Sequence, residues 1–284
     1  MIEVLLILAF IWVLFAVIQD FKTREVANWL NFSLIIFALA VRTFYSIFSN
    51  NFSYLWFGLF GLGIFLILGY LFYYSRLFAG GDAKLMIALG AVIAIESSWY
   101  YNTLVFFIFV FALFFGGVVY SLAYSAFLVV KNREKFSKEF NERIKTNKIY
   151  FALSFILLVI FSISAVLFSQ TILYLFAAFS VFFPLLYSYV KSVEQSCMIK
   201  KIDVSKLTAG DWIEEEIKIN ERIIKPNWEG ISEDDLKFLQ KHYKKEVTIK
   251  EGIPFTPAFL FALLVIIYIK YFGFSDWGLW SIFR

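Results

Sequence analysis

The sequence predicts an all-α polytopic membrane protein with about eight transmembrane helices (6 to 8) and a small α+β cytoplasmic insert before the last helix. Of its 284 residues, 61% are hydrophobic, 21% aromatic and only 17% charged. That composition excludes an ordinary water-soluble core. The chain also contains seven or eight stretches that approach the roughly 20 apolar residues needed to cross a bilayer.

Short polar breaks separate the expected spans. The first follows Met1 without the positive segment and cleavage site of a secretory signal, so we expect it to be retained. Ser169 and Gln170 are the only polar interruption of the apolar run 149–190, which predicts a helical hairpin. The expected spans are residues 2–19, 30–48, 54–75, 84–99, 103–130, 149–168, 171–190 and 255–272, of which the fourth is short.

The distribution of Lys and Arg predicts the orientation. Of the 26 basic residues, 23 lie in segments 20–29, 76–84, 131–148 and 191–252, which share one side of the membrane in this scheme. Basic residues favour the cytoplasmic side of short loops. We therefore expect a multi-pass protein of the cell membrane with its N-terminus outside.

Four regions are expected. Residues 1–130 form the helices that carry the candidate site, 131–190 a basic cytoplasmic loop and the hairpin, 191–252 the insert, and 253–284 the last helix and tail. In the insert, alternation over 213–224 predicts a strand hairpin, the run from Ser232 to Asp235 a capped helix start, and 246–250 a further strand.

Several functions are excluded or disfavoured by composition. With one cysteine (Cys197) and one histidine (His242), the chain has no disulfide, no Cys-rich zinc site and no Cys-His pair. We expect no cofactor and no metal. A net charge of +4, explained by the loops, gives no reason to expect nucleic-acid binding.

Carboxylates near apolar spans point to a functional site, because a charge at the bilayer centre costs about 2.5 to 3.5 kcal/mol on insertion scales. Five acids qualify: Glu3, Asp20, Asp82, Glu96 and Asp276. Glu3, Glu96 and Asp276 are expected at outer ends, where headgroup-level acids need no function.

Asp20 and Asp82 are separated by two complete crossings, so the chain returns to the same face and the two carboxylates are able to meet. Taken singly, Asp20 is also consistent with a marker of the membrane boundary, and Asp82 with an N-cap of the fourth helix. Gly80 and Gly81 directly precede Asp82, and glycine permits another backbone, such as an extended peptide substrate, to approach closely.

Two motifs around these aspartates resemble those of the type IV prepilin peptidases. The segment from Asp20 to Asn28 resembles Asp-x5-Ile-Pro-Asn, with Ala27 where the family often has proline. Gly81, Asp82 and Lys84 match Gly-x-Gly-Asp-x-Lys, with Ala79 in place of its first glycine. The similarity covers about residues 1–130. The insert and last helix resemble, more loosely, the extension of the archaeal preflagellin and prepilin peptidases.

The resemblance implies an aspartyl endopeptidase of the GxGD type, with catalytic residues Asp20 and Asp82. It would remove the short basic leader, a class III signal peptide, of pilin-like or archaeal flagellin precursors at the cytoplasmic face. Its partners would be those precursors, with a basic leader and a hydrophobic helix, and the lipid bilayer. Gly80, Gly81, Lys84 and Asn28 would support the motifs. Lys84 either orients the two acids or anchors the fourth helix, and Asn28 either holds the first loop or caps the second helix.

Two other interpretations fit parts of the sequence. A presenilin-like protease also uses Gly-x-Gly-Asp with a Pro-Ala-Leu motif near its last helices, to which Pro257–Ala258–Phe259 is only similar. A transporter or assembly scaffold would use the membrane carboxylates as a proton or cation relay, although Arg42 is the only internal basic residue of the first four spans, with Lys84 at the boundary of the fourth.

Overall fold

The computed structural model describes residues 1–96, 98–219 and 222–272. The chain divides into two compact units. The first unit contains Met1–Ala123 and the segment that begins at Ile253, and the second unit contains Tyr124–Gly252. The tail of the expected last region, residues 273–284, lies outside the described residues.

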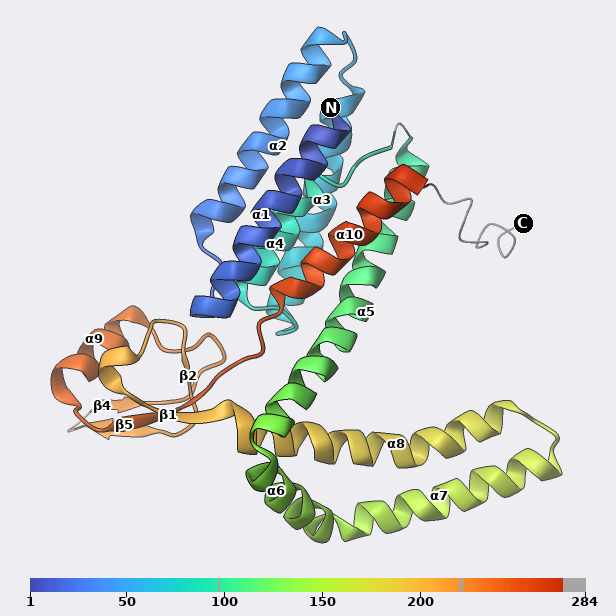
Figure 1. The fold of residues 1–284 in the computed structure, drawn as a ribbon, viewed down its shortest axis with the longest axis vertical. Helices are drawn as coiled ribbons and strands as arrows, with labels where there is room; N and C mark the ends of the chain where they lie inside the picture. The colour runs from blue at the N-terminus through green and yellow to red at the C-terminus, as the bar shows by residue number, and fades with distance from the viewer. Residues whose placement is uncertain (97, 220–221, 273–284) are drawn as a thin grey trace. The chain divides into compact units, whose positions relative to one another are not determined.

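The first unit is a helical bundle (Figure 1). The chain enters it with three long antiparallel helices, and the short fourth helix packs chiefly against the third and second. The last helix packs against the first. The helices are α1 (Ile2–Thr23), α2 (Asn28–Phe48), α3 (Ser53–Tyr74), α4 (Gly80–Gly90), the first part of α5 (Trp99–Lys131) and α10 (Thr256–Phe272).

The expected fourth span, 84–99, is wrong as a continuous helix. Helix α4 has only 11 residues, and the segment 91–95 that follows it is non-helical and buried. Asp82 at the start of α4 interacts with Asp20 at the end of α1, whereas Trp99 makes an edge-to-face contact with Phe57 near the start of α3. Residues 80–99 therefore still pass from one end of the bundle to the other, as a broken crossing.

Arg42 explains how the broken crossing is tolerated. Its guanidinium is fully buried and donates to the carbonyls of Ala91 (2.7 Å), Val92 (2.9 Å) and Ala94 (2.8 Å). A further hydrogen bond of 2.9 Å reaches the carbonyl of Tyr54. Non-helical backbone at membrane depth is stable only where protein groups satisfy it. Arg42 supplies those groups, and its charge lies beyond the negative C-terminal end of α4.

Glycines let α3 and α4 approach closely. A Cβ on Gly90 would lie 2.6 Å from Phe65 Cβ and 2.7 Å from the carbonyl oxygen of Gly61. A Cβ on Gly69 would lie 2.7 Å from a side-chain carbon of Ile87. Small residues at such positions are typical of tightly packed membrane helices. They fix α4 against α3 along its length.

Six helical segments among the described residues are long and apolar enough to cross a membrane. They are α1, α2, α3, α5, α7 (Lys148–Leu167) and α8 (Ile172–Val193) together with the π-helical turn η1 (Glu194–Met198). Helix α10 is apolar but shorter, with 17 residues. The predicted fold class is confirmed: the protein is helical and multi-pass, with a small strand-containing region before α10.

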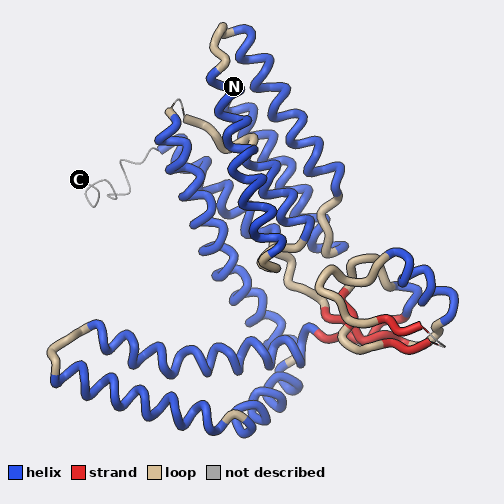
Figure 2. Tube along the Cα trace, turned by 180° about the vertical axis from the view of Figure 1, so that it is seen from behind, coloured by secondary structure: helices blue, strands red, loops and turns tan. Residues whose placement is uncertain are grey.

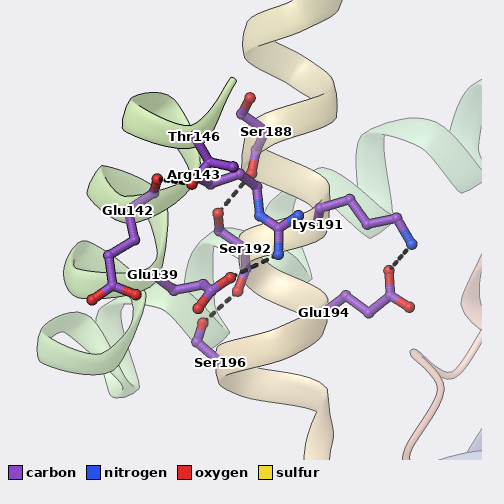
Figure 3. A network of polar contacts seen from close by, with 9 residues as sticks. All are labelled: Glu139, Glu142, Arg143, Thr146, Ser188, Lys191, Ser192, Glu194 and Ser196. Atoms are coloured by element: carbon purple, nitrogen blue, oxygen red, sulfur yellow. Dashed lines mark hydrogen bonds and ion pairs between the residues drawn. The ribbon is translucent and has the colours of Figure 1, made fainter. Parts of the chain in front are cut away.

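The second unit begins with the end of α5 and contains the predicted hairpin, α7 and α8. Segment 131–148, expected as a loop, is mostly the helix α6 (Arg133–Thr146). Glu139 and Arg143 form an i,i+4 ion pair at 2.7 Å on this helix. Such pairs stabilise a helix, and the prediction of a loop from charge alone does not take them into account. Figure 3 shows α6 beside α8 and η1, where Ser192 of α8 and Ser196 of η1 each donate to the carbonyl four residues earlier.

The insert is a small α+β body (red strands in Figure 2). A three-stranded antiparallel sheet has the order β1–β5–β2, and β3 pairs with β4 in the expected hairpin, Ile217 opposite Ile224. Helix α9 (Glu233–His242) begins at the expected cap, where Ser232 Oγ accepts from the N–H of Asp235. The strands are β1 (Ile199–Asp203), β2 (Trp212–Ile213), β3 (Ile217–Ile219), β4 (Arg222–Ile224) and β5 (Glu246–Lys250). A short 3-10 turn, η2 (Val204–Lys206), follows β1.

The position of Arg42 can be tested through Gly58, which faces its side chain from α3. A Cβ on Gly58 would overlap Arg42 Cδ and lie 2.7 Å from Nε, and the four hydrogen bonds prevent the guanidinium from moving aside. We expect Gly58→Ala to destabilise the protein by about 2 kcal/mol or more, as overpacking and lost hydrogen bonds do. Thermal unfolding in detergent, followed by circular dichroism, measures the change.

Gly63→Ala on the same helix is the matched control, because a Cβ there meets nothing within 4 Å. It should leave the unfolding temperature unchanged or raise it slightly, since alanine favours helix by up to about 1 kcal/mol over glycine. Equal effects of the two substitutions would contradict the proposed role of Gly58.

Candidate functional site

Asp20 lies in the last turn of α1 and is buried, with 6% of its surface exposed. Its Oδ2 accepts two hydrogen bonds from Thr256 on α10, one from the backbone N–H (3.0 Å) and one from the hydroxyl (2.9 Å). A residue that only marked the membrane boundary would be exposed. That alternative for Asp20 is therefore wrong: the carboxylate is held inside the protein.

Asp82 is the third residue of α4, and the N-cap is Ala79. The N-cap alternative for Asp82 is therefore wrong. Its carboxylate interacts with the backbone of Ala79, as acidic side chains at the third helical position do when they reach back to the cap. Asp82 also interacts electrostatically with Asp20. The structure brings the two predicted carboxylates together.

The turn between α1 and α2 forms the first motif. It leaves α1 through Arg24, which adopts a left-handed conformation with φ of 59°. Ala27, which stands where the similar family often has proline, has φ of −62°, close to the value that proline imposes. Its N–H, which proline would lack, donates to Gln19 Oε1 at 3.1 Å. This hydrogen bond braces the turn without proline.

The two motifs contact each other through Gly81. A Cβ there would lie 3.3 Å from both Cβ and N of Val26, so the backbones approach as closely as glycine allows. At Gly80 a Cβ would meet only Tyr73, at 3.7 Å. Asn31, buried in α2, donates from Nδ2 to the Gly81 carbonyl at 3.5 Å. Gly81 is the glycine that the packing requires.

Lys84 and Asn28 join the motifs on their exposed side. Lys84, the fifth residue of α4, donates from Nζ to Oδ1 of Asn28, the first residue of α2, at 2.7 Å. Asn28 is the first residue of α2 rather than its cap, which is Ala27. The contact favours the interpretation in which Asn28 holds the first loop. It places Lys84 in an interaction with the other motif.

The sequence did not reveal that Thr256 contacts Asp20 or that Asn31 contacts Gly81. Both are buried polar residues of helices, with Thr256 0% and Asn31 1% exposed. Thr256 is 236 residues from Asp20 in the chain, and no motif links them. Pro257, the next residue, favours a helix start, but a helix start does not identify what its first turn contacts. The loose resemblance of the last helix to the archaeal extension therefore gave no indication of its contact with Asp20.

The other singled-out residues lie in ordinary positions. Glu3 is exposed beside the terminal amine (3.5 Å), and Glu96 pairs with Lys270 (3.7 Å). Cys197 is buried, and His242 is exposed on α9. Asp276 lies outside the described residues. Within the described ranges, no three His, Cys, Asp or Glu side chains are grouped as metal ligands.

The arrangement fits acid–base chemistry on one water molecule. Two neighbouring carboxylates do not both ionise readily, so a pair shares a proton and supplies an acid and a base together. Such a pair is competent to activate water against a carbonyl and to donate a proton to the developing oxyanion. Hydrolysis of an amide requires both steps.

Comparisons with known proteins agree with this chemistry. Residues 7–122 match the model of the type IV leader peptidase family. A preflagellin peptidase of Methanococcus maripaludis is 35% identical over 78 residues, which are 28% of this chain and 34% of that protein. The match thus spans about a third of the length of the relative. No solved structure matches the chain. The resemblance predicted from the two motifs is confirmed.

The contact between Gly81 and Val26 predicts that substitution of Gly81 destabilises the protein more than substitution of Gly80. Gly81→Ala must displace the turn before α2 by a few tenths of an ångström, and we expect it to destabilise the protein by about 1 kcal/mol or more. Gly80→Ala, in the same turn of α4, should be neutral. Unfolding temperatures of the two variants, measured side by side in one detergent, decide the point. A larger loss for Gly80→Ala would refute the assignment.

Proposed function

Because the chain carries, in residues 7–122, a segment of the type IV leader peptidase family, we propose that it is a membrane aspartyl endopeptidase. Its reaction is removal of the short basic leader of type IV pilin-like or archaeal flagellin precursors. One observation carries the proposal: Asp20 and Asp82, far apart in the sequence, interact at the same end of the helical bundle. The similar preflagellin peptidase supports the substrate class.

The proposed mechanism uses the two carboxyl groups as a unit. One is ionised and takes a proton from water as the water oxygen attacks the scissile carbonyl carbon. The other, protonated, donates a hydrogen bond to the carbonyl oxygen as negative charge develops there. The C–N bond then breaks, and the leaving nitrogen takes the proton that the first carboxyl removed from water, becoming the amine of the mature chain. Water is consumed, and no group besides the carboxyls is needed.

The supporting residues have positioning roles in this proposal. Gly81 lets the first motif approach α4, and the contact between Lys84 and Asn28 fixes the exposed side of the two motifs. Gly80, next to Gly81, has little around it, so its role would be to leave room for an extended substrate. The division into four regions along the chain, with catalysis in residues 1–130, belongs to the same proposal. The relay function considered from the sequence is not favoured, since the relatives are peptidases.

Asp20→Asn and Asp82→Asn should each reduce leader cleavage at least 100-fold, because general acid–base groups contribute about 10² to 10⁴ in rate. Membranes containing the protein are mixed with pilin-like and flagellin-like precursors, and precursor size is followed with time. Asp234→Asn, at an exposed position on α9, is the matched control and should cleave like the wild type. Full cleavage by either active-site variant, expressed at wild-type levels, would exclude the aspartyl mechanism.

The orientation is a second part of the proposal. Most basic residues lie on one side of the predicted topology, so we place the Asp20 end in the cytoplasm and the N-terminus outside. Cys197→Ser removes the sole cysteine. In that background, a cysteine replacing exposed Asn51 between α2 and α3 should react with an impermeant maleimide on intact cells. Lys22 is exposed in the last turn of α1, at the opposite end of the bundle from Asn51, and Lys22→Cys should react only after lysis. The reverse labelling pattern would contradict the proposed orientation and place the N-terminus in the cytoplasm.

A further inference from the structure

The contact between α10 and Asp20 lies outside the segment that matches the peptidase family. The match ends at residue 122, whereas α10 begins at Thr256. Thr256 is completely buried, and both its backbone N–H and its hydroxyl donate to the same oxygen, Asp20 Oδ2. Nothing in the two aspartate motifs requires a partner from this part of the chain.

The geometry makes the two oxygens of Asp20 unequal. A carboxylate oxygen has two lone-pair directions, and two donors from Thr256 occupy those of Oδ2. Oδ1 makes no hydrogen bond to another described residue. The side chain is therefore fixed with Oδ2 turned toward α10 and Oδ1 left as the oxygen able to bind water or substrate.

The two hydrogen bonds have different consequences. The backbone N–H of Thr256 is one of the first N–H groups of α10, which have no partner within the helix. Asp20 satisfies it, and any residue except proline at position 256 would donate the same bond. The hydroxyl belongs to threonine or serine only. Its second hydrogen bond restricts rotation of the carboxylate, which the backbone bond alone does not.

We propose that Thr256 is a positioning residue for the reaction: its hydroxyl fixes the carboxylate of Asp20 so that Oδ1 faces the attacking water. The inference rests on the proposed function, because it assigns Asp20 to catalysis. It also makes α10 the third component of the site, after the two motifs that contribute the carboxylates. The first turn of α10 then acts through Asp20 and does not itself contact the reacting atoms.

The kinetic test compares substitutions of Thr256 that distinguish the effect of its hydroxyl from the effect of its side-chain shape. Thr256→Val keeps the β-branch and the backbone N–H but removes the hydroxyl, whereas Thr256→Ser keeps the hydroxyl. We expect Thr256→Val to lower kcat 10- to 100-fold with KM within about twofold, and Thr256→Ser to stay within threefold of the wild type, as loss of near-attack geometry predicts. Thr103→Val, at an exposed position on α5, is the control and should change neither constant.

A spectroscopic test does not depend on cleavage. The infrared difference between wild type and Asp20→Asn identifies the carboxyl stretching band of Asp20, whose frequency depends on the hydrogen bonds it accepts. Thr256→Val should shift this band, and Thr256→Ser should leave it in place. Should Thr256→Val fail to elute as a folded species, Thr256→Ala, which also lacks the hydroxyl, replaces it in both measurements.

The outcomes separate the inference from the proposed function. A wild type that cleaves leaders, together with a Thr256→Val variant of unchanged kcat, would overturn the inference alone. An unchanged Asp20 band in Thr256→Val would overturn it as well. A wild type with an Asp20 band that responds to Thr256→Val, but with no cleavage of any precursor, would overturn the proposed function while leaving the contact between the two residues in place.

Discussion

The first unit depends on satisfying the backbone of its broken crossing. After α4 ends at Gly90, the next five residues carry carbonyl groups in the apolar interior, where each unsatisfied group costs several kcal/mol. Arg42 meets three of these carbonyls, together with that of Tyr54. A guanidinium is suited to this task, since its planar fork offers five donors in fixed directions. A short α4 is stable because Arg42 replaces the hydrogen bonds that a longer helix would make.

That constraint reaches the candidate site through α4. The C-terminal end of the helix is held by Arg42, and its length is pressed against α3 at Gly61 and Gly69. Its N-terminal end carries Asp82, and Gly81 beside it packs on Val26 of the first motif. An 11-residue helix fixed at both ends and along one face has little freedom to rotate or slide. The position of Asp82 relative to Asp20 is therefore a consequence of packing throughout the bundle.

The sequence predicts those parts of the structure that have a signal in residue type. Apolar length predicts the long helices, and the identity and order of Asp20, Asp82 and Lys84 lead to the site, because chemistry restricts which side chains are useful there. The sequence identifies Arg42 as a basic residue inside a span, but its partners are backbone carbonyls, which every residue possesses. The residues after Gly90, from Ala91 to Ile95, are apolar, so in the sequence they look like a continuation of the helix. The carbonyl partners that end it have no signal in residue type. The contact of Thr256 depends on how α10 packs on α1, which local patterns do not encode.

The packing of α10 on α1 joins the two ends of the first unit's sequence at Asp20. A carboxylate that is 6% exposed is costly without hydrogen-bond donors, because a buried polar group left unsatisfied costs about 1 to 3 kcal/mol, and a charged one more. The helices from α1 to α4 bring the carboxylates together, but within the described residues the hydrogen-bond donors to Asp20 come from α10. The carboxylate of Asp20 therefore takes its orientation only when α10 packs against α1. The segment that matches the peptidase family contributes both carboxylates, and the helix beyond it determines how the first of them is held.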